Sequence, residues 1–296
     1  MDLKRVFNQR GFFHYVLVIE WLENDDKRTG MMLVEHLEAS GITCVYAGVE
    51  TSDGFRAVIE EALARVRDWG IPAIHIETHG EKPSDNIEED VLFGSGDGPL
   101  LTWPHLGEML APLNRAADFQ LMLVSAACYG AAAMGAMTGA THVAPFSVCI
   151  GYETEVIDES VIDSMIELYT ALLVERVPPS KAVARAEKML RHGESIDHST
   201  SVILAYQVFR YCVQEFNKSD PAIPPARWDI YKQRLFEAWE MWFPRELQER
   251  DETYRLDWDI VTANPTDEEL AEARAARGAK SETHGNRMRS VLLKSE

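Results

Sequence analysis

Residues 119–132 read Phe-Gln-Leu-Met-Leu-Val-Ser-Ala-Ala-Cys-Tyr-Gly-Ala-Ala. The continuous apolar run from Leu121 to Val124 is typical of a strand that is buried on both faces of a parallel sheet. Small residues follow this run, and then Cys128 and Gly130. Parallel sheets present their reactive groups at the carboxyl ends of the strands. The pattern therefore predicts a thiol at one edge of a sheet.

The same pattern occurs earlier, in residues 71–80, which read Ile-Pro-Ala-Ile-His-Ile-Glu-Thr-His-Gly. A short apolar strand again ends in a potentially reactive side chain, here His79, and Gly80 follows. The two positions are 128 − 79 = 49 residues apart. This length accommodates a loop and a crossover helix between neighbouring parallel strands. The sequence therefore predicts a dyad of Cys128 and His79 on one sheet edge.

Strand patterns alternate with amphipathic helix patterns along most of the chain, which predicts an α/β fold with a mostly parallel sheet of about six strands flanked by helices. We expect strands over residues 12–19, 42–49, 73–78, 121–124, 142–150 and 201–216, and a small hairpin over 91–101. We expect helices over residues 29–40, 54–69, 102–116, 160–174 and 178–192. The predicted domains are a main domain of 1–217, a C-terminal helical extension of 218–263, and a polar, flexible tail of 264–296.

The composition is that of an ordinary globular protein, with 46% hydrophobic and 26% charged residues among 296. The net charge of −19 argues against nucleic acid and anionic membranes as partners. No apolar run approaches the roughly 18 residues of a membrane span, and the N-terminus lacks the features of a signal peptide. We therefore expect a cytoplasmic protein.

The four cysteines are widely scattered and form neither a disulfide framework nor a metal-binding pattern. Cys44, Cys149 and Cys212 lie in apolar segments, so we expect them to be inert core thiols. The sequence predicts no cofactor and no metal.

A cysteine nucleophile attacks as the thiolate and needs a nearby base, a role that His79 can fill. The backbone N–H of Gly80, unobstructed by a side chain, can pair with that of Cys128 to form an oxyanion hole. Such a dyad requires no third residue, although Glu77 or a backbone carbonyl could orient the imidazole.

These two blocks resemble those of the caspase-like cysteine peptidases, and residues 91–110 and 148–158 are closest to the bacterial CHAT branch of that superfamily. The resemblance covers roughly residues 10–215. It implies a caspase-type fold and endopeptidase activity, with Cys128 as nucleophile and His79 as general base. Enzymes of this kind commonly need an activating protein, a ligand or an upstream protease, and a role in bacterial antiphage or stress signalling is implied.

The chain departs from the known patterns just before the nucleophile. Caspases have Gln-Ala-Cys, whereas Ala126 stands here in the position of that glutamine. CHAT proteins often read Ser-Ala-Cys, whereas this chain reads Ser-Ala-Ala-Cys over residues 125–128. The specificity pocket therefore cannot be carried over from caspases.

In the superfamily, the pocket for the residue before the cleaved bond is lined by the loop after the first strand, by the residues just before the cysteine and by the segment after the fifth strand. The second of these places holds Ser125 and Ala126 here, and the other two hold acidic residues, namely Asp25, Asp26, Glu153, Glu155 and Asp158. Carboxylates at this pocket would favour arginine or lysine in the substrate. The alternative is a solvated acidic surface in an acidic protein.

Two other functions stay open. One is a catalytically silent scaffold that keeps the caspase-like fold for interaction, against which the intact Cys128 and His79 argue. The other is a different thiol hydrolase that acts on small amides. That enzyme would require an acidic or lysine partner near the thiol, and the segments at the strand ends offer no evident one.

Overall fold

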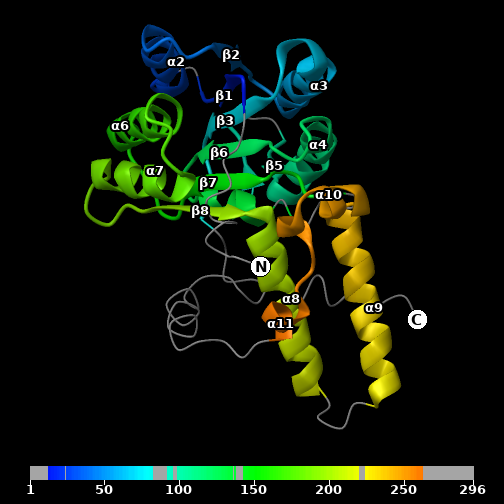
Figure 1. The fold of residues 1–296 in the computed structure, drawn as a ribbon. Coiled ribbons are helices and arrows are strands. Elements are labelled where there is room, and N and C mark those ends of the chain that lie inside the picture. The colour runs from blue at the N-terminus through cyan, green and yellow to red at the C-terminus, as the bar shows by residue number, and fades with distance from the viewer. Residues whose placement is uncertain are drawn as a thin grey trace.

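The computed structural model describes residues 13–23, 25–82, 92–95, 99–135, 137, 143–219 and 224–262. A six-stranded sheet with the strand order β2-β1-β3-β6-β7-β8 lies at its centre (Figure 1). Neighbouring strands are parallel except for β8, which runs antiparallel to β7. The predicted α/β fold with a mostly parallel sheet is confirmed, and it is consistent with the caspase-like fold that the resemblance implies.

The strands of the sheet are β1 (Tyr15–Trp21), β2 (Cys44–Gly48), β3 (Pro72–Thr78), β6 (Met122–Ala126), β7 (Val148–Tyr152) and β8 (Ile196–Thr200). Every residue of β1, β3, β6 and β7 is buried, as their mostly apolar sequences predict, and this burial includes the polar side chains of Glu20, His75 and Glu77. A separate antiparallel pair consists of β4 (Leu92–Phe93) and β5 (Leu101–Thr102), within the predicted hairpin.

Helices cover both faces of the sheet (Figure 1). One layer consists of α2 (Thr29–Ala39), α6 (Asp158–Tyr169) with the π-helical turn η2 (Thr170–Val174), and α7 (Pro179–Ala186) with the 3₁₀ turn η3 (Glu187–Met189). The other layer contains α3 (Ser52–Trp69) and α4 (Trp103–Ala116), and the 3₁₀ turn η1 (Gly130–Gly135) follows the cysteine. Within the described residues, no helix has both the length and the apolar character needed to cross a bilayer.

Alternation along the strands divides the core into two halves, because successive side chains point to opposite faces. In β1, Val18 packs in the cluster that contains Leu33 of α2. The next residue, Ile19, packs in the cluster that contains Phe55 of α3. The odd-numbered residues of β3 and the even-numbered residues of β6 share the α2 face, which is the face that carries the polar network described below.

The predicted strand over residues 201–216 is wrong, because this segment is helix α8 (Ser201–Ser219) and the last strand is the preceding β8. β-Branched residues at the start of the segment favoured a strand. Seven of its buried side chains nevertheless recur every three or four residues, the period of one helix face: Val202, Ala205, Tyr206, Phe209, Cys212, Val213 and Phe216. The polar sequence of β8 carries no apolar signal.

The C-terminal extension packs against the main domain through aromatic side chains. It comprises α9 (Pro225–Trp242), α10 (Arg245–Arg250), η4 (Glu252–Tyr254) and α11 (Trp258–Thr262). Helix α9 runs antiparallel to α8, with Tyr231 stacked on Phe216 at 4.0 Å and Trp239 edge-on to Phe209. The hydroxyl of Tyr254 donates to the carbonyl of Phe119, just before β6. The predicted tail of 264–296 lies outside the described residues.

Candidate active site

The strand register brings the predicted dyad together. Strands β3 and β6 are parallel neighbours, and their pairing places Glu77 opposite Ala126. Two residues further along each chain are His79 and Cys128, which therefore leave the sheet side by side. Adjacent strands lie about 4.8 Å apart, so both side chains belong to one site at the carboxyl edge of the sheet.

Gly80 packs directly on the turn that carries Cys128. A β-carbon at this position would lie 2.0 Å from the carbonyl oxygen of Cys128, so no larger residue fits. The segment is held in place because the N–H of Gly94 donates to the carbonyl of His79 at 3.1 Å. Within the described residues, the N–H groups of Gly80 and Cys128 donate to no protein acceptor. Both are available for the predicted oxyanion hole, which stays a prediction.

The thiol of Cys128 is half-buried and lies on the segment that follows β7. Its Sγ donates to the carbonyl oxygen of Val156 at 3.7 Å. In the described part of the chain, no hydrogen bond joins this sulfur to His79. Catalytic hydrogen bonds are often long or absent without substrate, and rotation about one side-chain bond would redirect the sulfur.

The imidazole of His79 has a carboxylate partner that the sequence interpretation did not assign. Its Nε2 lies 2.9 Å from Oδ2 of Asp26, and the N–H of Glu23 donates to the same oxygen at 2.7 Å. Partial burial raises the pKa of Asp26, but these two hydrogen bonds, together with the charges of His79 and Arg28, outweigh that effect, and the net shift is downward. An ionised Asp26 only accepts hydrogen bonds, so Nε2 carries a proton, and in the neutral imidazole Nδ1 is then the basic nitrogen.

Within the described residues, Glu77, the carboxylate suggested for this role, forms no hydrogen bond with His79. Glu77 is buried two residues earlier, within β3, and forms hydrogen bonds with His75 and Thr29. The signal that could have identified Asp26 is its position after the first strand. Identifying it, however, requires knowing that β1 lies next to β3, which local sequence patterns do not reveal.

The segment after β7 lies along the cysteine turn. The N–H of Tyr129 donates to the carbonyl of Thr154 at 3.0 Å, and its hydroxyl donates to Glu155 at 3.2 Å. Tyr129 has a φ of 56°, a conformation that non-glycine residues seldom adopt. These bonds hold the turn that carries Cys128.

The predicted acidic residues lie on two segments that flank the dyad. Asp25 is exposed beside Asp26, and Glu153, Glu155 and Asp158 are exposed after β7. Desolvation and the carboxylate of Asp197 raise the pKa of Glu153. The structure thus brings all five carboxylates to the edge that holds the dyad, although the carboxylate of Asp26 is engaged with His79.

An ion pair connects the two flanking segments. Nζ of Lys27, in the loop after β1, lies 3.7 Å from Oε1 of Glu159 in the first turn of α6. By contrast, Ser125 and Ala126 are buried within β6 and line no open surface. Among the described residues, the exposed carboxylates beside the dyad segments therefore come from the loop after β1 and the segment after β7.

The other thiols have different surroundings. Cys149 and Cys212 are buried, and burial together with the charge of Glu38 raises the pKa of Cys44 to about 11. Among the described residues, no three histidine, cysteine or acidic side chains converge as metal ligands.

The arrangement can support nucleophilic acyl transfer. It combines a partly accessible thiol, an imidazole whose tautomer is fixed by a carboxylate, and the backbone N–H groups of Gly80 and Cys128, which have no protein acceptor within the described residues. No protein-family model matches the chain, and no curated protein matches it significantly.

Proposed function

We propose that the protein is a cysteine endopeptidase in which Cys128 is the nucleophile and His79 the general base. The observation that best supports this function is the position of His79 and Cys128 at the ends of adjacent strands, with Gly80 packed on the cysteine carbonyl. This close packing sets the distance between the segment of His79 and the segment of Cys128. Two reactive side chains that were neighbours by chance would not need such packing.

In the proposed reaction, Nδ1 of His79 takes the proton from Sγ of Cys128. The thiolate attacks the carbonyl carbon of the peptide bond, and the N–H groups of Gly80 and Cys128 stabilise the oxyanion. The carbon–nitrogen bond breaks as His79 returns the proton to the leaving amine. Water, activated by His79, then hydrolyses the thioester, which releases the new carboxyl terminus and restores the thiol.

The surroundings of the dyad favour a polypeptide substrate. The side chain of His79 is 56% exposed, so the dyad is open to an extended chain. The carboxylates on both sides favour arginine or lysine before the cleaved bond, through charge-assisted hydrogen bonds. Glu155 is the foremost candidate for this contact, because Tyr129 ties it to the cysteine turn.

The resemblance to CHAT proteins supports regulated activity in the cytoplasm, by an activating protein or an upstream protease. It also supports a role in bacterial antiphage or stress signalling.

A catalytically silent scaffold is the alternative favoured by one contact. The thiol of Cys128 bonds to the carbonyl of Val156 instead of to His79. If this contact persisted with substrate bound, His79 could not take the thiol proton.

A thiol hydrolase of small amides is favoured by a different contact. The bond between Asp26 and His79 supplies the acidic partner that such an enzyme requires. The exposure of His79 argues against this function, because small-amide hydrolases generally enclose their substrates.

Incubation of a mixed peptide library and a denatured protein extract with the purified protein tests these functions. New termini, read by mass spectrometry, should appear with the wild type and with Cys44→Ala but not with Cys128→Ala. Cleavage after arginine or lysine would support the acidic pocket, and cleavage after other residues would refute it while sparing the peptidase. Hydrolysis of small amides alone would favour the third function. A thiol that stays unreactive towards peptide warheads with and without bacterial lysate would favour the scaffold.

A further inference from the structure

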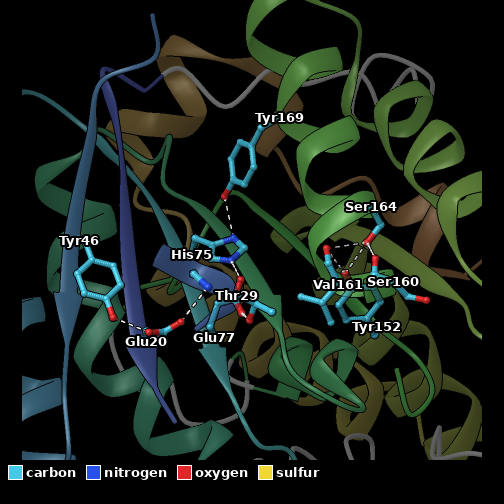
Figure 2. Close-up of polar contacts among 11 residues, drawn as sticks. Glu20, Thr29, Tyr46, His75, Glu77, Tyr152, Ser160, Val161, Ser164 and Tyr169 are labelled. Atoms are coloured by element: carbon cyan, nitrogen blue, oxygen red, sulfur yellow. Dashed lines mark hydrogen bonds and ion pairs between the residues drawn. The ribbon is translucent and has the colours of Figure 1, made fainter. Parts of the chain in front are cut away.

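Two buried carboxylates lie on the sheet beneath the start of α2. Glu20 in β1 and Glu77 in β3 are cross-strand neighbours on the same face of the sheet. Their side chains are 0% and 2% exposed. Figure 2 shows them between Tyr46 on one side and His75 with Tyr169 on the other. Buried carboxylates are costly unless they are well hydrogen-bonded, so their partners reveal what they hold in place.

Both carboxylates bind the start of α2. The hydroxyl of Thr29 donates to Glu77, and the N–H of Gly30 donates to Glu20 at 2.8 Å. The packing is close, since a β-carbon on Gly30 would lie 3.0 Å from Oε1 of Glu20 and 3.3 Å from Cγ of Glu77. The positive end of the helix dipole adds to this attraction.

Arg28, just before α2, connects this end of the loop to Glu20 and to the first residue after β1. Its Nη1 lies 3.6 Å from Oε2 of Glu20 and donates to the carbonyl of Leu22 at 3.4 Å. The loop between β1 and α2 is therefore held at Leu22 and at residues 28–30. Asp26, the partner of His79, lies between these two anchors.

The remaining capacity of the two carboxylates is also used. Tyr46 donates to Glu20, and Nε2 of His75 lies 3.0 Å from Oε1 of Glu77. Nδ1 of His75 lies 3.1 Å from the hydroxyl of Tyr169. Burial raises the pKa of both tyrosines, so their hydroxyls stay protonated. Both carboxylates thus accept hydrogen bonds from side chains within the core as well as from the start of α2.

We propose that Glu20 and Glu77 are positioning residues, which hold the loop after β1 so that Asp26 contacts His79. The carboxyl group of Asp26 bonds only to Glu23 of its own loop and to His79 within the described residues, so the anchors of the loop determine where it lies. The proposal rests on the proposed function only in assigning a catalytic role to His79. The positional coupling itself does not depend on cleavage.

The test measures the tautomer of His79 from the ¹⁵N chemical shifts of its ring in the full chain at pH 7.5. The wild type should hold the proton on Nε2, and Asp26→Ala should give a mixture of tautomers. Glu20→Gln and Glu77→Gln keep the side-chain shape but remove the charge, and each should shift the tautomers towards the Asp26→Ala mixture. The rate of Cys128 alkylation by iodoacetamide should fall about tenfold in the same variants, in a Cys44→Ala background, as expected for one lost charge-assisted hydrogen bond.

A second buried network on the same face of the sheet provides the matched control. The hydroxyl of Ser164 bonds to Tyr152 at 2.6 Å and to the carbonyl of Ser160 at 2.6 Å (Figure 2). Ser164→Ala should lower stability without changing the tautomer of His79. If Glu77→Gln does not fold, Thr29→Val removes the same bond from the loop side.

A double variant decides whether the effect passes through Asp26. Glu20→Gln combined with Asp26→Ala should behave like Asp26→Ala alone, because the positioned group is already gone. The proposal would be overturned if the Glu20 and Glu77 variants lost stability but kept the wild-type tautomer of His79. It would also be overturned if Glu20→Gln changed the tautomer or the alkylation rate further when Asp26→Ala is already present. Absence of peptide cleavage by a wild type with the expected tautomer shifts would instead count against the peptidase function.

Discussion

The substitution Gly80→Ala should disable the site by displacing the turn that carries Cys128. The new β-carbon would lie 2.0 Å from the carbonyl oxygen of Cys128, whereas ordinary contacts begin at 3.4 Å. The segments must therefore move apart by 3.4 − 2.0 = 1.4 Å. A displacement of about 1 Å in a catalytic group can cost on the order of 100-fold in rate. The strain should also cost about 1–3 kcal/mol of stability, as other forced overpacking does.

The assay is the rate of cleavage of a peptide identified from the library, together with urea unfolding. Gly41→Ala is the matched control, because Gly41 has a φ of 76° but open space where the β-carbon would lie. That variant should lose about 1 kcal/mol through backbone strain and keep its activity. Wild-type cleavage by Gly80→Ala, at any stability, would refute the close packing of Gly80 on Cys128 as a requirement of the site.

Three further predictions concern the charges around the dyad. Glu155→Gln should lower kcat/KM about tenfold for substrates with arginine before the cleaved bond and leave leucine substrates unchanged; equal losses for both would contradict a role in specificity. Because the pKa of Asp26 is lowered on folding, its contribution to stability is complete above the ordinary value of 3.8 and is lost as the pH falls further. The difference in urea midpoint between wild type and Asp26→Ala should therefore shrink below that pH, and a constant difference would exclude this linkage. Iodoacetamide at pH 7 should modify Cys128 well before Cys44, whose pKa is about 11, and peptide mapping would reveal the reverse order if the assignment were wrong.

Much of the fold could be predicted because its central strands carry their own signal. Strands β3 and β6 are mostly apolar, and their burial on both faces explains that composition, although β3 also buries His75 and Glu77. The same strands locate His79 and Cys128 at strand ends. Parallel pairing at the observed register then places the two residues together.

The last strand could not be found in this way. Strand β8 pairs with only one neighbour, lies at an antiparallel edge and reads Ile-Asp-His-Ser-Thr. An edge strand needs no apolar run. The β-branched residues that favoured a strand over 201–216 belong instead to the following helix α8. Length favoured a helix, since 19 residues exceed ordinary strands.

The partner of His79 was missed for a different reason. The contact between Asp26 and His79 joins residues 53 positions apart, and it depends on β1 lying beside β3. Strand order is set by long-range packing and is not visible in local patterns. His75, two residues before Glu77, is fully buried and has a hydrogen-bond partner at each ring nitrogen.

Covalent labelling with an arginyl peptide acyloxymethyl ketone, read by intact mass, tests the dyad most directly. The proposed mechanism predicts one adduct per chain, on Cys128. The adduct should be absent in Cys128→Ala and form on the order of 100-fold more slowly in His79→Ala, which lacks the base. Labelling of His79→Ala at the wild-type rate, or labelling at another cysteine, would contradict the account.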